Sequence, residues 1–169
     1  MTVVETERLF LRELTTDDAA FMLSLANEPS YLRFIGDKGL RTVDDARTYL
    51  LQGPIASYTT NGFGLYLVAL KGEPPPIGIC GLIKRPALEH PDVGFAFLPA
   101  YWSQGYAYEA ATAVLAYGRG TLKLPRILAI TQTDNTSSLR LLRRLGLTQQ
   151  GLMRLSPDDH EVALFELDA

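Results

Sequence analysis

The segment from Phe95 to Ala110 constrains the fold more than any other part of the chain. It begins as an apolar run, reaches Pro99, and continues past Gly105 into an alanine-rich helical pattern. Because proline cannot donate to a β-ladder, the segment predicts a strand, a short loop and then a helix. The first N–H groups of a helix are unpaired and can bind an anion such as phosphate. An ordinary strand-to-helix turn with one glycine fits the same pattern, and this segment alone leaves both interpretations open.

The rest of the chain alternates between strand and helix patterns. Strands are expected over residues 6–14, 65–70, 77–84, 92–98, 126–131, 148–155 and 161–167, and helices begin near residues 15, 42, 105 and 135. We expect Pro29 to stop the first helix, residues 30–41 to form a loop, and the second helix to end near Pro54 or resume toward Gly62. The three prolines at 74–76 predict a hairpin loop that is not strand. This order indicates one mixed α+β domain over residues 1–169, with about seven strands and about four helices.

Composition and charge exclude several classes of function. The 169 residues carry 16 Lys and Arg against 19 Asp and Glu, a net charge of −3, which argues against nucleic acid as a partner. No run of about 18 apolar residues is present and the N-terminus lacks a signal-peptide pattern, so we expect a cytoplasmic protein with no membrane partner. One cysteine and two distant histidines give no metal-ligand spacing, so no metal is expected.

The loop between the strand expected at residues 92–98 and the following helix resembles a known cofactor motif. Pro99, Gly105 and Ala107 follow the strand as in the (Gln/Arg)-x-x-Gly-x-(Gly/Ala) pyrophosphate loop of the GNAT superfamily of acetyl-CoA-dependent N-acetyltransferases. Trp102 replaces the usual Gln or Arg, and the run Tyr-Trp-x-x-Gly-Tyr-Ala-x-Glu-Ala resembles the version in the RimJ/RimL-type branch.

Two further segments resemble the same branch. Residues 6–12 are similar to its opening Thr-Glu-Arg-Leu-x-Leu-Arg. Asn135-x-x-Ser138, followed by Leu-Gly-Leu at 145–147, is similar to its Asn-x-x-Ser to Leu-Gly-Phe segment. Three motifs in the family's order over nearly the whole chain are much more specific than any one of them.

The resemblance implies a fold and a cofactor site. The sheet would be mostly antiparallel, and its fourth and fifth strands, residues 92–98 and 126–131, would splay apart to hold acetyl-CoA. The pantetheine arm would lie along the edge of the strand that ends at Phe97 and Leu98, where a main-chain N–H would stabilise the oxyanion formed when an amine attacks directly in a ternary complex. The pyrophosphate would lie on the amides of Ser103, Gln104, Gly105, Tyr106, Ala107 and Tyr108.

The catalytic assignments are less constrained. Asn135 is expected to cap a helix, and by resemblance to contact the cofactor arm. Ser138 is the candidate general acid for the departing thiolate, since Leu142 stands where many relatives carry a tyrosine; it also fits a plain position in a capped helix. Asp92 is the candidate base that deprotonates the amine, directly or through water, and also fits a solvated strand start. Glu109 fits a helix-dipole role.

Cys80 is expected to be a buried small hydrophobe, and Arg12 to form a strand-anchoring ion pair. The basic excess over residues 119–144 is either a solvated face or a contact for the 3′-phosphate of coenzyme A.

No motif in the sequence identifies the acceptor amine. It would be a protein N-terminus or a small molecule, bound by the loops at 30–41 and 156–160. Acidic residues near the C-terminus either favour a cationic acceptor or only aid solubility. The oligomeric state stays open, a homodimer included. The alternative to an enzyme is a non-catalytic acyl-CoA-binding module of the same fold.

Overall fold

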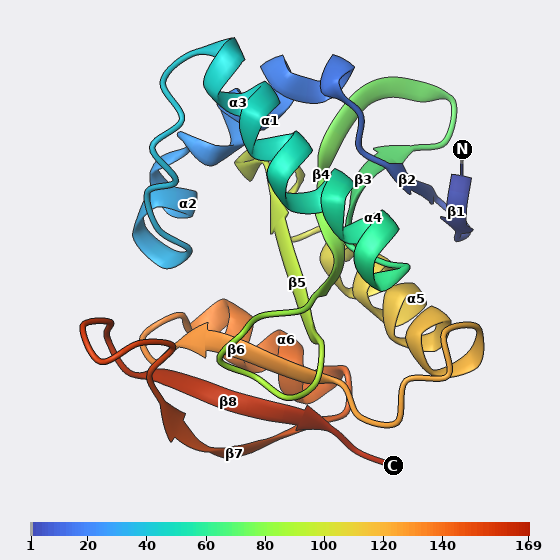
Figure 1. Ribbon diagram of the computed structural model, residues 1–169. Helices are drawn as coiled ribbons and strands as arrows, with labels where there is room; N and C mark the ends of the chain where they lie inside the picture. Colours follow the sequence, from blue (N-terminus) through green and yellow to red (C-terminus); the bar gives the residue numbers. More distant parts are fainter. Residues whose placement is uncertain (1) are drawn as a thin grey trace.

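An eight-stranded mixed sheet runs through the structure in the order β1-β2-β3-β4-β5-β6-β8-β7 (Figure 1). The computed structural model describes residues 2–169. Every neighbouring pair is antiparallel except β5 with β6, which is parallel. The strands are β1 (Thr2–Glu5), β2 (Leu9–Glu13), β3 (Leu65–Leu70), β4 (Glu73–Ile83), β5 (Asp92–Phe97), β6 (Leu128–Gln132), β7 (Leu147–Met153) and β8 (Val162–Leu167).

The strands β5 and β6 meet at their first residues and then diverge. Asp92 and Leu128 form the single residue pair between them, and the Leu128 N–H donates to the Pro91 carbonyl at 2.8 Å. Figure 1 shows the two strands separating beyond this point. The predicted splaying of residues 92–98 from 126–131 is therefore confirmed, and it opens the sheet on one side of β5.

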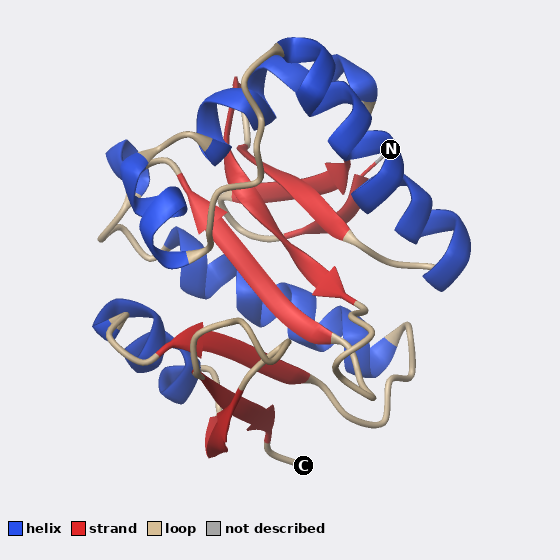
Figure 2. Ribbon diagram, turned by 60° about the vertical axis from the view of Figure 1, so that its left-hand side comes forward, coloured by secondary structure: helices blue, strands red, loops and turns tan. Residues whose placement is uncertain are grey.

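Helices cover both faces of the sheet (Figure 2). Alternation along β3 places Tyr66 and Val68 in one core, which includes residues of α5 and α6, and Leu67 and Ala69 in the other, which includes residues of α1, α2 and α3. The helices are α1 (Ala19–Ala26), α2 (Pro29–Phe34), α3 (Val43–Leu50), α4 (Ala56–Asn61), α5 (Tyr106–Gly120) and α6 (Thr136–Arg144). None of the helices in the described part of the chain is long and apolar enough to span a bilayer.

The segment from α3 to α4 confirms one of the two boundaries expected for the second helix. Thr42 and Asp45 form a reciprocal capping box at the start of α3. A π-helical turn, Leu51–Ile55, contains Pro54 and carries the chain into α4. The helix then stops at Gly62, whose φ of +80° is the left-handed conformation that glycine adopts without strain.

Two expectations about segments that contain proline are wrong. The first helix does end before Pro29, at Ala26, but Pro29 then begins α2 instead of leading into a loop, because a proline in the first helical turn lacks only an N–H that has no partner there. Residues 29–34, mostly expected as loop, are therefore helical. The prolines at 74–76 lie within β4, where β4 pairs with β3 alone because its pairing with β5 begins at Gly78. Proline has no N–H to donate to a neighbouring strand, and here it is tolerated because β4 has no partner strand on the β5 side.

The fold class is as expected, with slightly more elements. The strand β1 adds an edge strand before the predicted first strand, and its pairing with β2 makes a hairpin. The helix α2 adds to the four helices that were expected. The strand-to-helix segment that opens with β5 leads, as predicted, through a short loop into α5.

Candidate functional site

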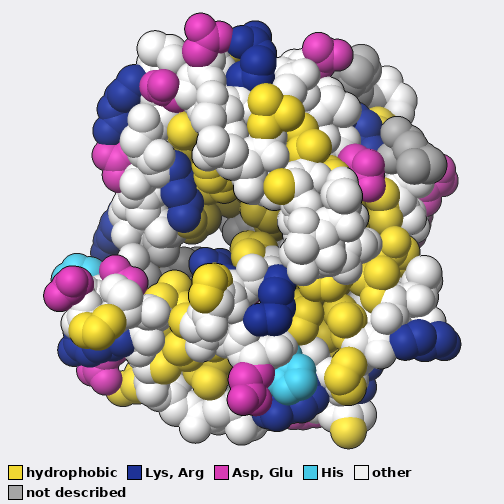
Figure 3. Space-filling model, in the orientation of Figure 1, with side chains coloured by type: hydrophobic (Ala, Val, Ile, Leu, Met, Phe, Trp, Pro, Cys, Tyr) yellow, Lys and Arg dark blue, Asp and Glu magenta, His cyan; other side chains and the backbone are white. Residues whose placement is uncertain are grey.

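A cleft of about 1200 Å³ lies at the splayed side of β5. Its lining comes from β5, the loop before α5, the first turn of α6 and the segment around α2, which are far apart in the sequence. The space-filling view shows a hollow in the face of the molecule, with Lys and Arg side chains at its border (Figure 3). All the predicted site residues line this cleft except Leu98 and Gln104.

The exposed edge of β5 presents main-chain donors to the cleft. In an antiparallel pair, N–H groups point alternately toward and away from the partner strand. The Leu98 N–H donates to the Ile77 carbonyl of β4 at 2.9 Å, so the N–H groups of Phe95 and Phe97 point to the opposite side. Because β6 pairs with β5 only at Asp92, these two donors border the cleft. The prediction of Leu98 as a donor is thus wrong, since its N–H is already bonded, whereas Phe97 is available and Phe95 was missed.

The loop after β5 has the geometry of an anion site. Gly105, the residue before the first helical turn of α5, has a φ of +84°, and Ser103 has a φ of +61°. This backbone turns the first amides of α5, from Tyr106 onward, toward the cleft, where the helix dipole is positive. Gln104 lies outside the cleft lining, and its side chain donates to the Ala100 carbonyl at 3.1 Å.

Trp102 fixes the end of β5. Its indole N–H donates to the Phe97 carbonyl at 2.9 Å, although about half of its surface is exposed. That carbonyl belongs to the same residue whose N–H faces the cleft. The tryptophan therefore ties the anion loop to the exposed strand edge. In the sequence, this residue stands out because Trp102 replaces the Gln or Arg of the general motif.

The N-terminal hairpin holds the other side of the loop. The Glu109 carboxylate in the first turn of α5 accepts hydrogen bonds from the Thr6 hydroxyl, from the Arg8 main-chain N–H at 2.9 Å and from Arg8 Nε at 2.7 Å. Arg8 also donates to the Gln104 carbonyl at 3.0 Å and lies 4.4 Å from the centre of the Tyr106 ring. Glu109 therefore has a structural role, because it holds the N-terminal hairpin against the first turn of α5. Thr6 and Arg8 of the opening motif supply the hairpin's side of this contact.

The start of α6 forms the opposite wall of the cleft. Asn135 caps the helix, as expected, by accepting from the Ser138 main-chain N–H at 3.2 Å. Ser138 is partly exposed and lines the cleft, whereas Leu142 one turn later is buried in the core. Thr136 and Ser137 of the same turn also line the cleft, so the hydroxyl of Ser138 is one of three in this turn that can exchange a proton with a molecule bound there.

Asp92 lies at the point where β5 and β6 meet. Its side chain is 1% exposed, and its carboxylate accepts from Arg85 Nε at 2.9 Å. Burial raises the pKa of Asp92 above its ordinary value, and the positive charge of Arg85 opposes that shift. The expected alternative of a solvated strand start is wrong, because the carboxylate is buried and paired. A carboxylate with a raised pKa, at the wall of a cleft, is suited to accept a proton.

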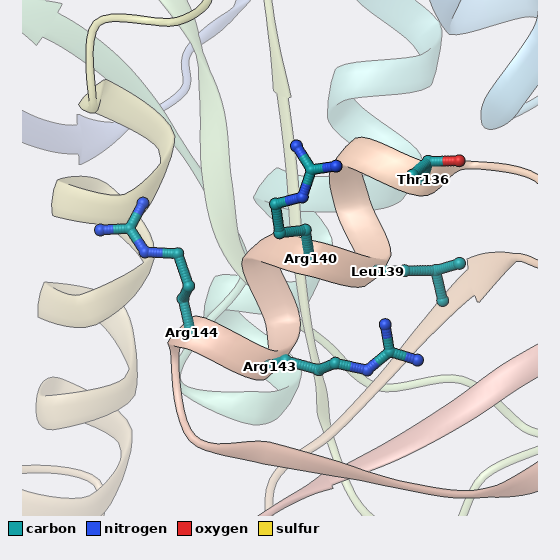
Figure 4. Close-up of a pocket in the computed structure, with 5 residues that line it drawn as sticks. All are labelled: Thr136, Leu139, Arg140, Arg143 and Arg144. Carbon is teal, nitrogen blue, oxygen red and sulfur yellow. The ribbon is translucent and has the colours of Figure 1, made fainter.

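The basic excess over residues 119–144 divides into two groups. Arg119 donates to the Leu167 carbonyl, and Arg126 pairs with Glu166, so both are used to hold the C-terminal strand. By contrast, Arg140 and Arg144 line the cleft; Figure 4 shows Arg144 reaching from α6 toward α5, where it lies 4.4 Å from the centre of the Tyr108 ring, while Arg140 extends from the preceding turn. A shallow depression of about 440 Å³ on the surface of α6 is lined by Thr136, Leu139, Arg140, Arg143 and Arg144. The cleft thus has a cationic rim on the side of the anion loop.

Two residues outside the cleft behave as expected. Cys80 is fully buried in β4, and burial raises the pKa of its thiol. Arg12 forms a two-bond ion pair with Asp18, at 2.8 and 2.9 Å, which ties β2 to the turn before α1. Among residues 2–169, no three His, Cys, Asp or Glu side chains gather as a metal site.

Comparison with known proteins gives consistent matches. A family model described as an acetyltransferase (GNAT) domain matches residues 8–148. The chain is 29% identical over 154 residues to the uncharacterized N-acetyltransferase YoaA of Bacillus subtilis, covering 90% of this chain and 86% of that protein. A crystal structure of an acetyltransferase from Agrobacterium tumefaciens is 25% identical with a TM-score of 0.82, over 100% of this chain and 95% of that one. RimL, an alpha-N-protein acetyltransferase solved in complex with coenzyme A, is similar in fold, with 16% identity and a TM-score of 0.78 over 98% of this chain and 97% of that one.

Proposed function

The chain belongs to the GNAT acetyltransferase family, and on that premise we propose that it moves the acetyl group of acetyl-CoA to a primary amine. The opening motif, the tryptophan in the loop and the Asn-x-x-Ser segment favour the RimJ/RimL-type branch within the family. The amine belongs either to a protein N-terminus or to a small molecule.

The residues of the cleft fit acetyl-CoA. The free N–H groups of Phe95 and Phe97 can bond the amide-rich pantetheine arm. The amides of Ser103 and of residues 105–108, which line the cleft, can bind the pyrophosphate, and Arg140 and Arg144 can bind the remaining phosphate. When bound, acetyl-CoA supplies an acetyl group activated as a thioester.

Three groups of this chain then have roles in the transfer. Of the two free N–H groups, that of Phe95 is nearer to Asp92 along the strand, and it stabilises negative charge on the thioester carbonyl oxygen, a task that needs no particular side chain. Asp92 accepts the proton of the amine, directly or through water, because its raised pKa lies closer to neutrality than that of an exposed carboxyl. Ser138 donates a proton to the departing sulfur.

The observation that carries the proposal is the parting of β5 from β6 after one residue pair. It leaves two main-chain donors of β5 facing a cleft whose far end is the positive end of α5. N–H groups without a partner strand are free to bond a ligand, so these two donors offer backbone bonds to a molecule that lies along β5.

Calorimetric titration with acetyl-CoA tests this proposal on three proteins: wild type, Gly105→Glu and Gly72→Glu. The first variant places a carboxylate where the pyrophosphate would bind. Gly72 is the matched control, because its φ of +77° carries the same backbone strain and a side chain there meets open space in the β3–β4 turn.

Wild type and Gly72→Glu are expected to bind acetyl-CoA at micromolar Kd, and Gly105→Glu to bind at least tenfold more weakly. Release of free thiol on addition of amines then separates an acetyltransferase from an acyl-CoA-binding module. A folded wild type that does not bind acetyl-CoA contradicts the proposal.

A further inference from the structure

The cleft contains a second set of polar side chains that no acetyl-CoA contact uses. It consists of the two hydroxyls and two cations of Tyr31, Lys38, Tyr49 and Arg85, all of which line the cleft. We refer to these four residues as the donor cluster. They come from α2, the loop after it, α3 and the segment after β4, and α2 and α3 contribute to the core on the opposite face of the sheet from α6.

Arg85 is the centre of the donor cluster. Its Nε donates to Asp92 at 2.9 Å, and its charge acts on Tyr31, Tyr49 and Lys38. Within residues 2–169, no hydrogen bond engages its two terminal nitrogens. The planar guanidinium can therefore bond a second oxyanion while it keeps its bond to the carboxylate.

Three members of the donor cluster bond to one another or to Asp92: the Tyr31 hydroxyl donates to that of Tyr49, and Arg85 donates through Nε to Asp92. Burial raises the pKa of Tyr31 and of Tyr49, so both phenols keep their protons. Partial desolvation of its ammonium group lowers the pKa of Lys38, although the residue as a whole is exposed. The charge of Arg85 makes a smaller contribution in the same direction. Arg85 is paired with Asp92, whereas no ion pair engages Lys38 within residues 2–169, so an anion that binds beside both side chains is stabilised chiefly by the charge of Lys38.

The charges of the cleft favour an anion overall. Among the described lining residues, six are cationic and three are anionic, an excess of three positive charges in a chain whose net charge is −3. The cations are Arg33, Lys38, Lys84, Arg85, Arg140 and Arg144, and the anions are Glu28, Asp92 and Asp134. Two of the anionic residues are already paired, since Asp92 bonds Arg85 and Asp134 lies 3.6 Å from Arg33.

The other charges do not neutralise the donor cluster. Lys84 donates to the Arg85 and Leu88 carbonyls of the β4–β5 loop. Since Asp92 and Asp134 are paired, Glu28 is the remaining anion among the described lining residues. The acidic residues near the C-terminus do not line the cleft, and Glu166 is bonded to Arg126. The cationic acceptor that their sequence position suggested is therefore not supported.

We propose that the acceptor is a small amine that also carries an anionic oxyacid group, carboxylate or phosphate, and that Lys38 and Arg85 bind that group. This inference rests on the proposed acetyltransferase function. The size argument follows from Arg85, which contacts Asp92, the residue assigned to deprotonate the amine. The anion and the amine of the acceptor must then lie within a few bonds of each other, as they do in an amino acid.

Initial rates of thiol release with paired acceptors test the proposal. One arm compares α-amino acids with their amides, which differ in the carboxylate. A second arm compares phosphoethanolamine with ethanolamine, which differ in the phosphate. Each member is assayed across a pH range that covers the different pKa values of the amines. The proteins are wild type, Lys38→Gln, and Lys71→Gln as a control that removes the same charge at the β3–β4 turn, outside the cleft.

The anionic member of at least one pair is expected to have a kcat/KM at least tenfold above its neutral partner. Lys38→Gln should reduce that preference several-fold, mainly through KM, whereas Lys71→Gln should keep it. Equal or reversed preference in wild type overturns the proposal, as does retention of the full preference in Lys38→Gln. Acetyl-CoA binding without acetylation of any pair also overturns it, and acetyl-CoA that fails to bind instead contradicts the proposed function itself.

Discussion

Replacing Glu109 with Gln tests whether the N-terminal hairpin positions the anion loop. The carboxylate accepts three hydrogen bonds, one of them from Arg8 Nε at 2.7 Å, and Arg8 in turn holds the Gln104 carbonyl at 3.0 Å. Glutamine keeps one acceptor oxygen, so its NH₂ group either faces Arg8 Nε or replaces the oxygen that accepts from the Thr6 hydroxyl and the Arg8 main-chain N–H. The ion pair is lost in either case.

The expected magnitude follows from the exposure of the pair. A hydrogen bond to a charged group contributes about 1.5–3 kcal/mol. The side chains of Arg8 and Glu109 are 42% and 20% exposed, so solvent screening reduces the expected loss of stability to about 1–2 kcal/mol. For a chain of this size, that loss lowers Tm by about 2–8 °C. Because the loop loses its anchor, the Kd for acetyl-CoA should rise about three- to tenfold.

The stability difference should depend on pH. Burial raises the pKa of Glu109, but the hydrogen bonds from Thr6 and Arg8 outweigh it, and the folded-state pKa is lowered. A carboxyl with a lowered folded-state pKa contributes stability that is present above its unfolded pKa and lost as pH falls through its folded value. The Tm of wild type should therefore exceed that of Glu109→Gln at pH 7, and the difference should shrink below about pH 4.

Thermal unfolding across pH and calorimetry with acetyl-CoA measure both effects. Glu166→Gln is the matched control, because it removes a carboxylate bonded to Arg126 on β8, outside the cleft. That control should lower Tm without changing the acetyl-CoA Kd. If Glu109→Gln also lowers Tm but leaves the Kd unchanged, the hairpin supports the fold alone and the positioning argument is refuted.

Three further predictions follow from single contacts. Trp102→Phe removes the indole N–H bonded to Phe97, a contact of about 1 kcal/mol, and should weaken acetyl-CoA binding about fivefold by calorimetry. Asp92→Asn should lower kcat/KM by about 10²- to 10⁴-fold and abolish an acid limb that wild type shows above the ordinary Asp pKa, because the base acts only when ionised. Gly81→Ala places a Cβ 2.1 Å from a main-chain carbonyl oxygen and should cost about 3 kcal/mol or more in thermal unfolding, whereas Gly120→Ala meets open space and should be neutral or stabilising.

Features set by neighbouring residues could be predicted from the sequence. The capping box of Thr42 with Asp45, the Asn135 cap and the left-handed stop at Gly62 each depend on residues within one turn. The passage from β5 into α5 depends on a proline and a glycine in one short segment. The family motifs added the splayed strands, which no periodicity in the sequence indicates.

Features set by sheet order could not be predicted. The bond between Arg8 and Glu109 joins residues 101 positions apart, and it exists only because the β1–β2 hairpin lies beside the start of α5. The availability of Phe97 rather than Leu98 depends on the pairing register of β5 with β4. Likewise, the prolines within β4 are tolerated only because β5 ends opposite Gly78.

The same arginine can serve both halves of the proposed reaction because its donors are divided in space. Arg85 uses Nε for Asp92, which leaves its terminal nitrogens for an anion on the acceptor. An anion bound there reduces the positive field on Asp92, which raises the pKa of that carboxyl further and makes it a stronger base. A lysine at this position has one point charge and would have to share it between the two anions. Recognition of an anionic acceptor and activation of its amine are thus coupled through a single guanidinium, at the position where β5 pairs with β6.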